Sequence, residues 1–268
     1  MPDSPDHAPG AYERRRLLEA ESRARAYNLR LQALATALSG AATPAEVYGA
    51  VVDYGVGGMG EATGEQLLPV HSSTLYVLAD DCLELVHGAG FEPSLIAHYQ
   101  RIPLAAPVPA ADAVRSGQAI WIRSKAAFLQ RYPHLAEHIQ LLSGEAVLSL
   151  PLMVEQRALG VLNLTFSQPL AFDADERGFL LSLAALCAQA LERSRLYDAE
   201  QRRSRDQERA LARLKQLLEI TDRLNGLGDA VEMARVLVEG RFDVYGPVAG
   251  GVALLREDGR LAHVSLYG

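Results

Sequence analysis

Apolar residues near the front of the chain recur at alternating spacings of three and four positions. From about residue 12 to residue 38 this spacing predicts one long helix with a narrow apolar stripe, the surface that one helix presents to another. The stripe consists of Leu17, Ala20, Ala24, Tyr27, Leu31, Leu34 and Leu38. Ser39-Gly40 should end this helix, and Thr43 should cap a second helix that begins at Pro44.

The middle of the chain alternates short apolar strands with short helices. We expect strands at 74–79, 83–88, 119–122, 146–152 and 158–166. The last two flank the polar turn Glu155-Gln156-Arg157 and should form a hairpin. Short helices are expected around 110–115 and within 125–140, with a break at Pro133.

A second long helical pattern begins at residue 173, where Asp173 and Glu176 have the spacing of a capping box. Its apolar stripe holds Phe179, Leu183, Leu186 and Ala190. Residues 198–209 carry four acids and four arginines but no Gly or Pro, so the helix should continue there as a solvated rod. A continuous helix of this kind can carry a rotation or a register shift to a following domain.

The order of helix, glycine, helix and strand pair occurs twice. Leu38-Ser39-Gly40 precedes the strand pair that ends at Gly90, and Leu224-Asn225-Gly226 precedes a second pair expected at 252–255 and 261–264. Such repetition predicts a tandem of one small domain, an organisation more typical of a modular sensor than of a single enzyme. Because the second copy stops after its strand pair, we expect the chain to be a fragment of a longer protein or a truncated reading frame.

Composition argues against several classes of protein. The formal net charge is −7, whereas a nucleic-acid surface needs a basic patch. Two cysteines form no disulfide framework, and the first ten residues carry acid and proline where a signal peptide needs a basic start. The most apolar stretch, 179–191, is too short to cross a bilayer. We therefore expect a cytoplasmic chain without a nucleic-acid or membrane partner, and disorder at residues 1–11.

One glycine-rich motif fits a dinucleotide-binding pattern. Gly55-Val-Gly57-Gly58-Met-Gly60 reads G-x-G-x-x-G, and Asp80 lies twenty residues beyond it. That fold requires a strand before the glycines and a helix after them. Residues 47–52 instead have helical spacing, and the stretch that follows holds Gly64 and Pro69. A loop from helix to strand is therefore the favoured interpretation.

Two further features suggest chemistry. His134-Leu-Ala-Glu137-His138 fits a zinc-peptidase pattern in which two histidines bind metal and the glutamate activates water. No third ligand is obvious, so surface histidines are favoured. Cys187 lies on an apolar helix stripe, where a buried thiol is favoured over a nucleophile. We assign no catalytic residue and no metal ligand, expect no enzymatic activity, and leave the cofactor open.

The candidates for ligand binding are Tyr99, Arg115, Trp121, Tyr132 and His138. They belong to the loop-rich half of the chain, where concave pockets are built from irregular connections. Each of them also fits an ordinary half-buried residue.

Several separate motifs share one order along the chain. They are Ile102-Pro-Leu-Ala-Ala-Pro-Val-Pro109, Ala113-Val-Arg115-Ser-Gly117-Gln-Ala-Ile-Trp121, Ser149-Leu-Pro-Leu152 with Ala158-Leu-Gly-Val-Leu162, and the stretch from Phe172 to Tyr197. In this order they resemble a bacterial GAF domain over residues 28–195, and residues 211–268 resemble the opening third of a second one. The signature of cyclic-nucleotide GAF domains, a bilin-attaching cysteine and the cysteine set of the methionine-sulfoxide-reducing GAF enzymes are not found in the sequence.

The resemblance implies an α+β fold, a GAF-like antiparallel sheet flanked by helices, with a ligand pocket on one side and long N- and C-terminal coiled-coil-like helices. We expect an N-terminal helix at 12–40, a GAF domain at 28–195, a connecting helix at 196–215 and an incomplete second GAF domain at 216–268. A homodimer is expected, with a seam formed by Leu17, Tyr27, Leu31, Leu34, Leu38, Phe179, Leu183 and Leu186.

Proteins that resemble such a tandem are typically sensor histidine kinases or phosphatase regulators. The resemblance thus implies a signal-input module that binds a small ligand or partner and relays a change to an output kinase or phosphatase domain. Two alternatives stay open. One is a small GAF-fold enzyme that uses His134, Glu137 and His138, or Cys187. The other is a structural dimerisation module whose pocket is filled by its own side chains.

Overall fold

The computed structural model describes residues 9–56, 68–91, 99–136, 144–225, 250–255 and 259–267. The chain divides into two compact units, residues 1–197 and 198–268. The elements of the first unit, in chain order, are α1 (Pro9–Ser39), α2 (Pro44–Ala50), the π-helix η1 (Val51–Val56), β1 (Val70–Ala79), β2 (Cys82–Ala89), β3 (Arg101–Pro103), α4 (Pro109–Ser116), β4 (Ile120–Ile122), α5 (Lys125–Arg131), the 3₁₀-helix η2 (Pro133–Leu135), β5 (Ala146–Val154), β6 (Arg157–Phe166) and the first part of α7 (Ala174–Asn225).

The first unit is built around one antiparallel sheet with the strand order β3-β2-β1-β6-β5-β4. Strict alternation along β6 sends Leu162 and Leu164 to one face and Asn163 and Thr165 to the other. Strands β1 and β6 approach closely at Gly160, where a Cβ atom would lie 2.0 Å from the Tyr76 carbonyl oxygen. Only glycine fits there.

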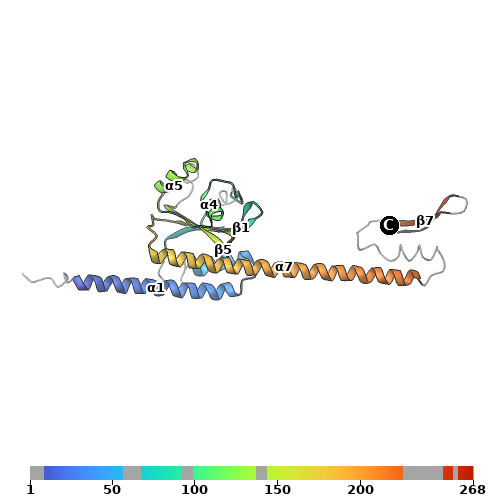
Figure 1. Cartoon of the computed structure of the whole chain (residues 1–268), viewed down its shortest axis with the longest axis horizontal. Coiled ribbons are helices and arrows are strands. Elements are labelled where there is room, and N and C mark those ends of the chain that lie inside the picture. The colour runs from blue at the N-terminus through green and yellow to red at the C-terminus, as the bar shows by residue number, and fades with distance from the viewer. Residues whose placement is uncertain are drawn as a thin grey trace, which may run out of the picture. The chain divides into compact units, whose positions relative to one another are not determined.

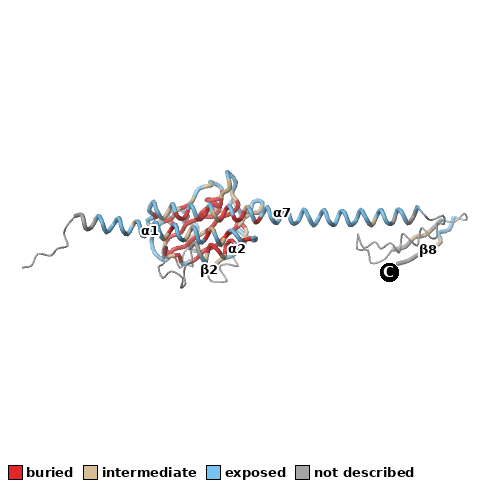
Figure 2. The backbone as a smooth tube through the Cα atoms, turned by 90° about the horizontal axis from the view of Figure 1, so that it is seen from below, coloured by how far each residue is buried: buried red, intermediate tan, exposed pale blue. Residues whose placement is uncertain are grey.

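Helices cover both faces of this sheet. Figure 1 shows α1 and α7 lying side by side along one face, with α4 and α5 on the other. The larger hydrophobic core lies between the sheet and α1, α2 and α7, and it includes Leu34, Val47, Leu150 and Leu180. Figure 2 shows these buried segments in red. A second, smaller core lies under α4 and α5.

Helices α1 and α7 run in the same direction. Arg23 Nη1 donates to Asp173 Oδ2 at 3.1 Å, and the rings of Tyr27 and Phe179 stack with centroids 4.6 Å apart. Further along, the Arg193 guanidinium donates to the carbonyl oxygen of Leu38. Successively later residues of α1 therefore meet successively later residues of α7.

The structure confirms both predicted helix starts. Thr43 and Glu46 form a reciprocal capping box at α2, with the Glu46 carboxylate 3.0 Å from the Thr43 nitrogen. Asp173 and Glu176 do the same before α7, with both hydrogen bonds at 2.8 Å. Each box satisfies backbone N–H groups that have no partner within the helix.

Some element boundaries differ from the sequence prediction. Helix α1 begins at Pro9, so the last three residues of the segment expected to be disordered are helical, and residues 1–8 lie outside the described part. Strand β3 was not predicted; its three residues pair with the start of β2. The strand expected at 83–88 begins one residue earlier, at Cys82 of β2.

The structure places most of the expected dimer seam inside a single chain. Five of its eight residues are buried within a single chain: Tyr27, Leu34, Leu38, Phe179 and Leu183. Leu31 and Leu186 are half-buried against the same core, and Leu17 is exposed. The apolar stripe predicted correctly that α1 is covered between Tyr27 and Leu38, but periodicity does not say by which chain. The dimer itself stays a prediction.

The second unit contains the remainder of α7 and a hairpin of β7 (Gly250–Leu255) and β8 (Leu261–Tyr267). The two strands pair antiparallel, as predicted for 252–255 and 261–264. The helix expected around Met233 and Leu237 lies outside the described residues. None of the helices in the described part of the chain has the length and apolar character that a membrane span requires.

Candidate ligand pocket

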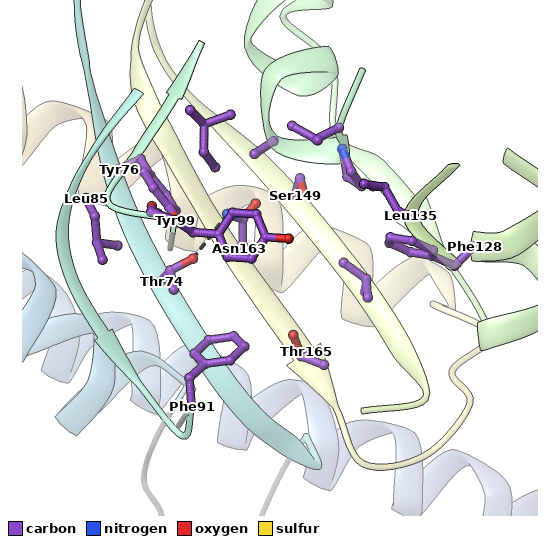
Figure 3. A pocket seen from close by; sticks show the side chains of 15 residues that line it. Thr74, Tyr76, Leu85, Phe91, Tyr99, Phe128, Leu135, Ser149, Asn163 and Thr165 are labelled. Atoms are coloured by element: carbon purple, nitrogen blue, oxygen red, sulfur yellow. Dashed lines mark hydrogen bonds between the residues drawn. The ribbon is translucent and has the colours of Figure 1, made fainter. Parts of the chain in front are cut away.

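A cavity of about 140 Å³ lies on the sheet face opposite α1 and α7. Its floor is formed by polar side chains of the three central strands. Thr74 of β1, Asn163 of β6 and Ser149 of β5 lie in one row, because Asn163 is directly opposite both of the others in the strand register. Thr165 lies two residues further along β6. Figure 3 shows this floor from close by.

The walls of the cavity consist of aliphatic and aromatic side chains. The aromatic members are Tyr76, Phe91, Tyr99 and Phe128. The aliphatic members are Leu85, Ile102, Val108, Pro109, Ala110, Leu135 and Val147. They come from the sheet, α4, α5, η2 and the connections between these elements, so the closure of the cavity depends on how the helices are fastened to the sheet.

Two polar atoms of the floor are buried without a hydrogen-bond partner. Asn163 Nδ2 donates to Thr74 Oγ1 at 3.1 Å, but within the described ranges Asn163 Oδ1 has no partner, and neither has Ser149 Oγ. Ser149 is only 1% exposed. Buried polar atoms are normally hydrogen-bonded, and an unpaired one costs about 1–3 kcal/mol. Two adjacent unpaired atoms in a cavity therefore indicate a site that a polar group of a ligand can complete.

A hydrogen bond joins the segment that carries Tyr99 to strand β1. Tyr76 OH donates to the Tyr99 carbonyl oxygen at 2.9 Å. Burial raises the pKa of the Tyr76 hydroxyl well above its usual range. Tyr76 thus remains a protonated hydrogen-bond donor at neutral pH and holds this wall of the cavity in place.

Asp112 connects the elements of the opposite wall. Its carboxylate accepts from Tyr132 OH at 2.7 Å and from the Arg115 guanidinium. Arg115 also donates to the carbonyl oxygens of Leu104 and Ala106, the latter at 3.1 Å. Burial, together with the Asp112 carboxylate, raises the pKa of Tyr132. This network holds α4, α5 and the connection before α4 together.

The sequence candidates are distributed around this site rather than gathered in it. Tyr99 lines the cavity. Arg115 and Tyr132 meet at Asp112 and support the wall without lining the cavity. His138 lies outside the described residues.

Trp121 lies on the other side of the sheet. Its ring packs edge-on against Phe172 at 5.1 Å, and the Arg177 guanidinium carbon lies 5.0 Å from the centre of the ring. Its placement among the ligand-binding candidates is therefore corrected: Trp121 contacts residues at and just before the start of α7.

The floor residues are not among the candidates predicted from the sequence, because those candidates belong to the loop-rich half of the chain. A signal was available in the strands. Ser149, Asn163 and Thr165 interrupt otherwise apolar strands at positions whose neighbours on both sides are Leu or Phe. A polar residue on the inner face of a strand buried on both sides needs a partner, which is a reason to suspect a ligand.

The other candidate motifs do not form a reactive centre in the described residues. His134 Nε2 donates to the Pro107 carbonyl oxygen at 2.8 Å, whereas Glu137 and His138 lie outside the described part. Cys187 is fully buried in α7, and burial raises its pKa to about 12, so the thiolate is scarce at neutral pH. The segment before the glycine-rich motif is helical, as the favoured interpretation required. Among the described residues, no group of three or more side chains is arranged to hold a metal ion.

An antiparallel sheet with a pocket on one face and paired helices on the other defines a class of ligand-binding sensor domain. A family model for the GAF domain matches residues 41–192, more than half of the chain, and the chain belongs to that family. GAF domains provide a fold for sensing and ligand binding. No curated protein sequence matches the chain.

The chain is also similar to several solved structures. The GAF domain of a phosphoenolpyruvate-protein phosphotransferase (ptsP) from Coxiella burnetii is similar with a TM-score of 0.52 and 16% identity, over 66% of this chain and 98% of that one. The corresponding domain from Acinetobacter has a TM-score of 0.49 and 14% identity, over 65% and 97%. Free methionine-R-sulfoxide reductase from Neisseria meningitidis, in complex with its substrate, has a TM-score of 0.48 and 16% identity, over 65% and 93%. The likeness to the Coxiella domain shows the GAF fold.

Proposed function

We propose that this chain is a signal-input module. A small ligand binds in the pocket of the first unit, and α7 relays the bound state to an output domain such as a histidine kinase or a phosphatase. The homodimer and the second GAF domain belong to the same proposal. Catalysis is not part of it, because the polar atoms of the floor are suited to recognition and include no base paired with a nucleophile.

The proposal rests on the observation that neighbouring residues of one strand lie on opposite faces of the sheet, one in the pocket and the next in the core. In β5, Ser149 lines the pocket while its neighbours Leu148 and Leu150 pack in the core shared with α1 and α7. In β6, Asn163 and Thr165 likewise line the pocket, while the residues on either side of them in the strand pack in that core. Because packed cores have little free space, a ligand that moves these strands must also move what is packed behind them.

Trp121 provides a direct test of the relay. It is the only tryptophan of the chain, and it contacts Phe172 and Arg177 on the face away from the pocket. A thermal-shift screen of small molecules identifies binders, since a ligand at a hundred times its Kd adds about 2.7 kcal/mol of stability. Each binder should then change the Trp121 fluorescence, excited at the red edge where tyrosine does not absorb.

A variant that fills the pocket separates binding there from binding elsewhere. Ala110 lines the cavity and is buried, so Ala110→Phe should abolish both the thermal shift and the fluorescence change. Ala126 of α5 is exposed, and Ala126→Phe is the matched control that should leave both intact. Binding without any change at Trp121 would contradict the relay. Failure of every compound to bind would favour the structural alternative, a dimerisation module with no ligand.

The exposed leucines of α7 support the homodimer. Leu211, Leu214 and Leu218 follow a spacing of three and four and are each more than half exposed. We expect Leu211→Asp combined with Leu218→Asp to shift sedimentation from dimer to monomer. Leu181→Asp, on an exposed site outside this stripe, is the control. A monomeric wild-type chain would remove the dimer from the proposal.

The hairpin of the second unit supports a second GAF domain at 216–268. Strands β7 and β8 pair antiparallel as β1 and β2 do, and they follow a long helix in the chain. An isolated two-stranded hairpin is marginally stable in water. Hydrogen exchange should therefore be much faster in β7 and β8 than in β5 and β6. Equal protection would mean that 216–268 is a complete fold of its own, and not the start of a GAF domain.

A further inference from the structure

We propose that the ligand of the pocket is a simple phenol, a neutral compound with one aromatic ring that carries a hydroxyl group. This inference rests on the proposed function, because it names the chemical class that the same pocket accepts. Three properties of the cavity lead to it: its size, the aromatic side chains of its walls, and the two unpaired polar atoms of its floor.

The size of the cavity suits one ring. Its volume of about 140 Å³ is close to that of an engineered protein cavity, about 150 Å³, that binds benzene. The walls then determine the character of the ring. Tyr76, Phe91, Tyr99 and Phe128 line the cavity from different elements, and aromatic pairs gain stability in stacked or edge-on arrangements beyond the burial of their area.

The floor specifies the substituent. Ser149 and Asn163 are directly opposite each other in the register of β5 and β6, a position in which Cβ atoms lie about 5 Å apart. Asn163 Oδ1 can only accept a hydrogen bond, whereas Ser149 Oγ–H can donate one. A phenolic hydroxyl does both at once: it donates to Asn163 Oδ1 and accepts from Ser149 Oγ. It thereby pairs the two floor atoms that have no partner in the described part of the chain.

Charge separates phenols from aromatic acids. The described residues that line the cavity are all neutral. A carboxylate placed against this floor would face Asn163 Oδ1, an acceptor, and would be removed from water without a cation beside it, which is strongly unfavourable. A ring without a polar group would instead leave both floor atoms unpaired.

Three compounds of matched size test the proposal on the full chain by isothermal titration calorimetry. Phenol should bind. Toluene, with a methyl group in place of the hydroxyl, should bind at least on the order of tenfold more weakly, because it leaves both polar atoms unpaired. Benzoate should show no binding. Equal affinity for phenol and toluene would overturn the proposal, and so would tighter binding of benzoate than of phenol.

Variants of Ser149 and Asn163 show whether these two side chains bind the hydroxyl group of phenol. Ser149→Ala and Asn163→Leu should each weaken phenol binding on the order of ten- to a hundredfold and leave toluene binding unchanged or improved. Ser182→Ala, an exposed serine of α7, is the matched control and should bind phenol like the wild type. Unchanged phenol affinity in Ser149→Ala would overturn the assignment.

The thermal midpoint of the free variant excludes a merely structural role for Ser149. Its hydroxyl has no partner among the described residues, so Ser149→Ala should keep or raise the midpoint of the unliganded protein while it lowers phenol affinity. A lowered midpoint with unchanged phenol affinity would assign the hydroxyl to folding and overturn the proposal.

Failure of this inference can be distinguished from failure of the proposed function. If no phenol binds but another class of compound does, and Ala110→Phe abolishes that binding, the ligand class is wrong and the sensor pocket stands. If no compound of a chemically diverse set binds in a manner that Ala110→Phe abolishes, both are wrong.

Discussion

The hydroxyl of Tyr27 is buried between α1 and α7 and has no hydrogen-bond partner among the residues that the structure describes, although the Tyr27 ring stacks on Phe179 at 4.6 Å. Tyr27→Phe keeps the ring contact and removes only the unpaired oxygen. A buried hydroxyl without a partner costs about 1–3 kcal/mol. We therefore expect Tyr27→Phe to raise the free energy of unfolding by about 1 kcal/mol, a gain in Tm of roughly 2–4 °C for a unit of this size.

Loss of the whole ring should have the opposite effect. Tyr27 is 5% exposed, so Tyr27→Ala leaves a cavity between the two helices and should destabilise the fold by about 3–5 kcal/mol. Urea unfolding followed by circular dichroism measures both variants. Tyr197→Phe, at an exposed position of α7, is the matched control and should change the stability by less than about 0.5 kcal/mol.

The stability of the protein at alkaline pH provides a second test of the Tyr27 hydroxyl. Burial raises the pKa of Tyr27 from 10.0 to about 12. Below pH 10 the hydroxyl is protonated in both the folded and the unfolded chain, so its contribution is fully present. Between pH 10 and 12 the unfolded chain releases this proton first, and stability falls. Tyr27→Phe should therefore lose less stability than the wild type over this interval.

A single result would refute this reasoning. If Tyr27→Phe lowers the free energy of unfolding by about 1 kcal/mol or more, then the hydroxyl makes a hydrogen bond in solution that offsets its burial. The packing around the Tyr27 ring would then include a polar contact, and the alkaline behaviour of the variant would have to be explained by other tyrosines.

Two further predictions follow from close packing and burial. Gly160→Ala should abolish cooperative thermal unfolding or lower the Tm severely, because a Cβ atom would lie 2.0 Å from the Tyr76 carbonyl oxygen; a Tm within a few degrees of the wild type would show that β1 and β6 separate easily there. Cys187, fully buried and with its pKa raised to about 12, should be alkylated by iodoacetamide far more slowly than the half-buried Cys82 in the native chain, as peptide mass spectrometry will show. Comparable rates would mean that α7 opens readily in solution.

Much of the fold could be predicted because local patterns and tertiary packing agree. Alternation along 158–166 gives a strand whichever way it pairs, and the turn at Glu155-Gln156 fixes its partner. The boxes at Thr43 and Asp173 mark helix starts by chemistry that needs no distant residue. Strand β3 was missed because three residues are too few to show a period.

The errors have a different physical origin. An apolar stripe reports that a helix is covered, and Leu34 or Phe179 would have the same spacing in a dimer as in the core of one chain. The site was sought among aromatic and charged residues of the loop-rich half of the chain, which included Trp121 although its ring packs on the face away from the pocket. Ser149 and Asn163 were overlooked because their significance depends on burial and on a missing partner, and neither can be derived from one strand alone.

The parallel course of α1 and α7 determines where the chain enters and leaves the first unit. A hairpin of antiparallel helices would return the chain to the end at which it entered. Here α1, whose 31 residues span roughly 45 Å, begins at the end of the unit where α7 starts, and α7 leaves at the opposite end. The chain therefore enters the domain at one end and leaves it at the other. A duplicated copy can be appended by extending one helix, without a loop that doubles back and without rebuilding the sheet.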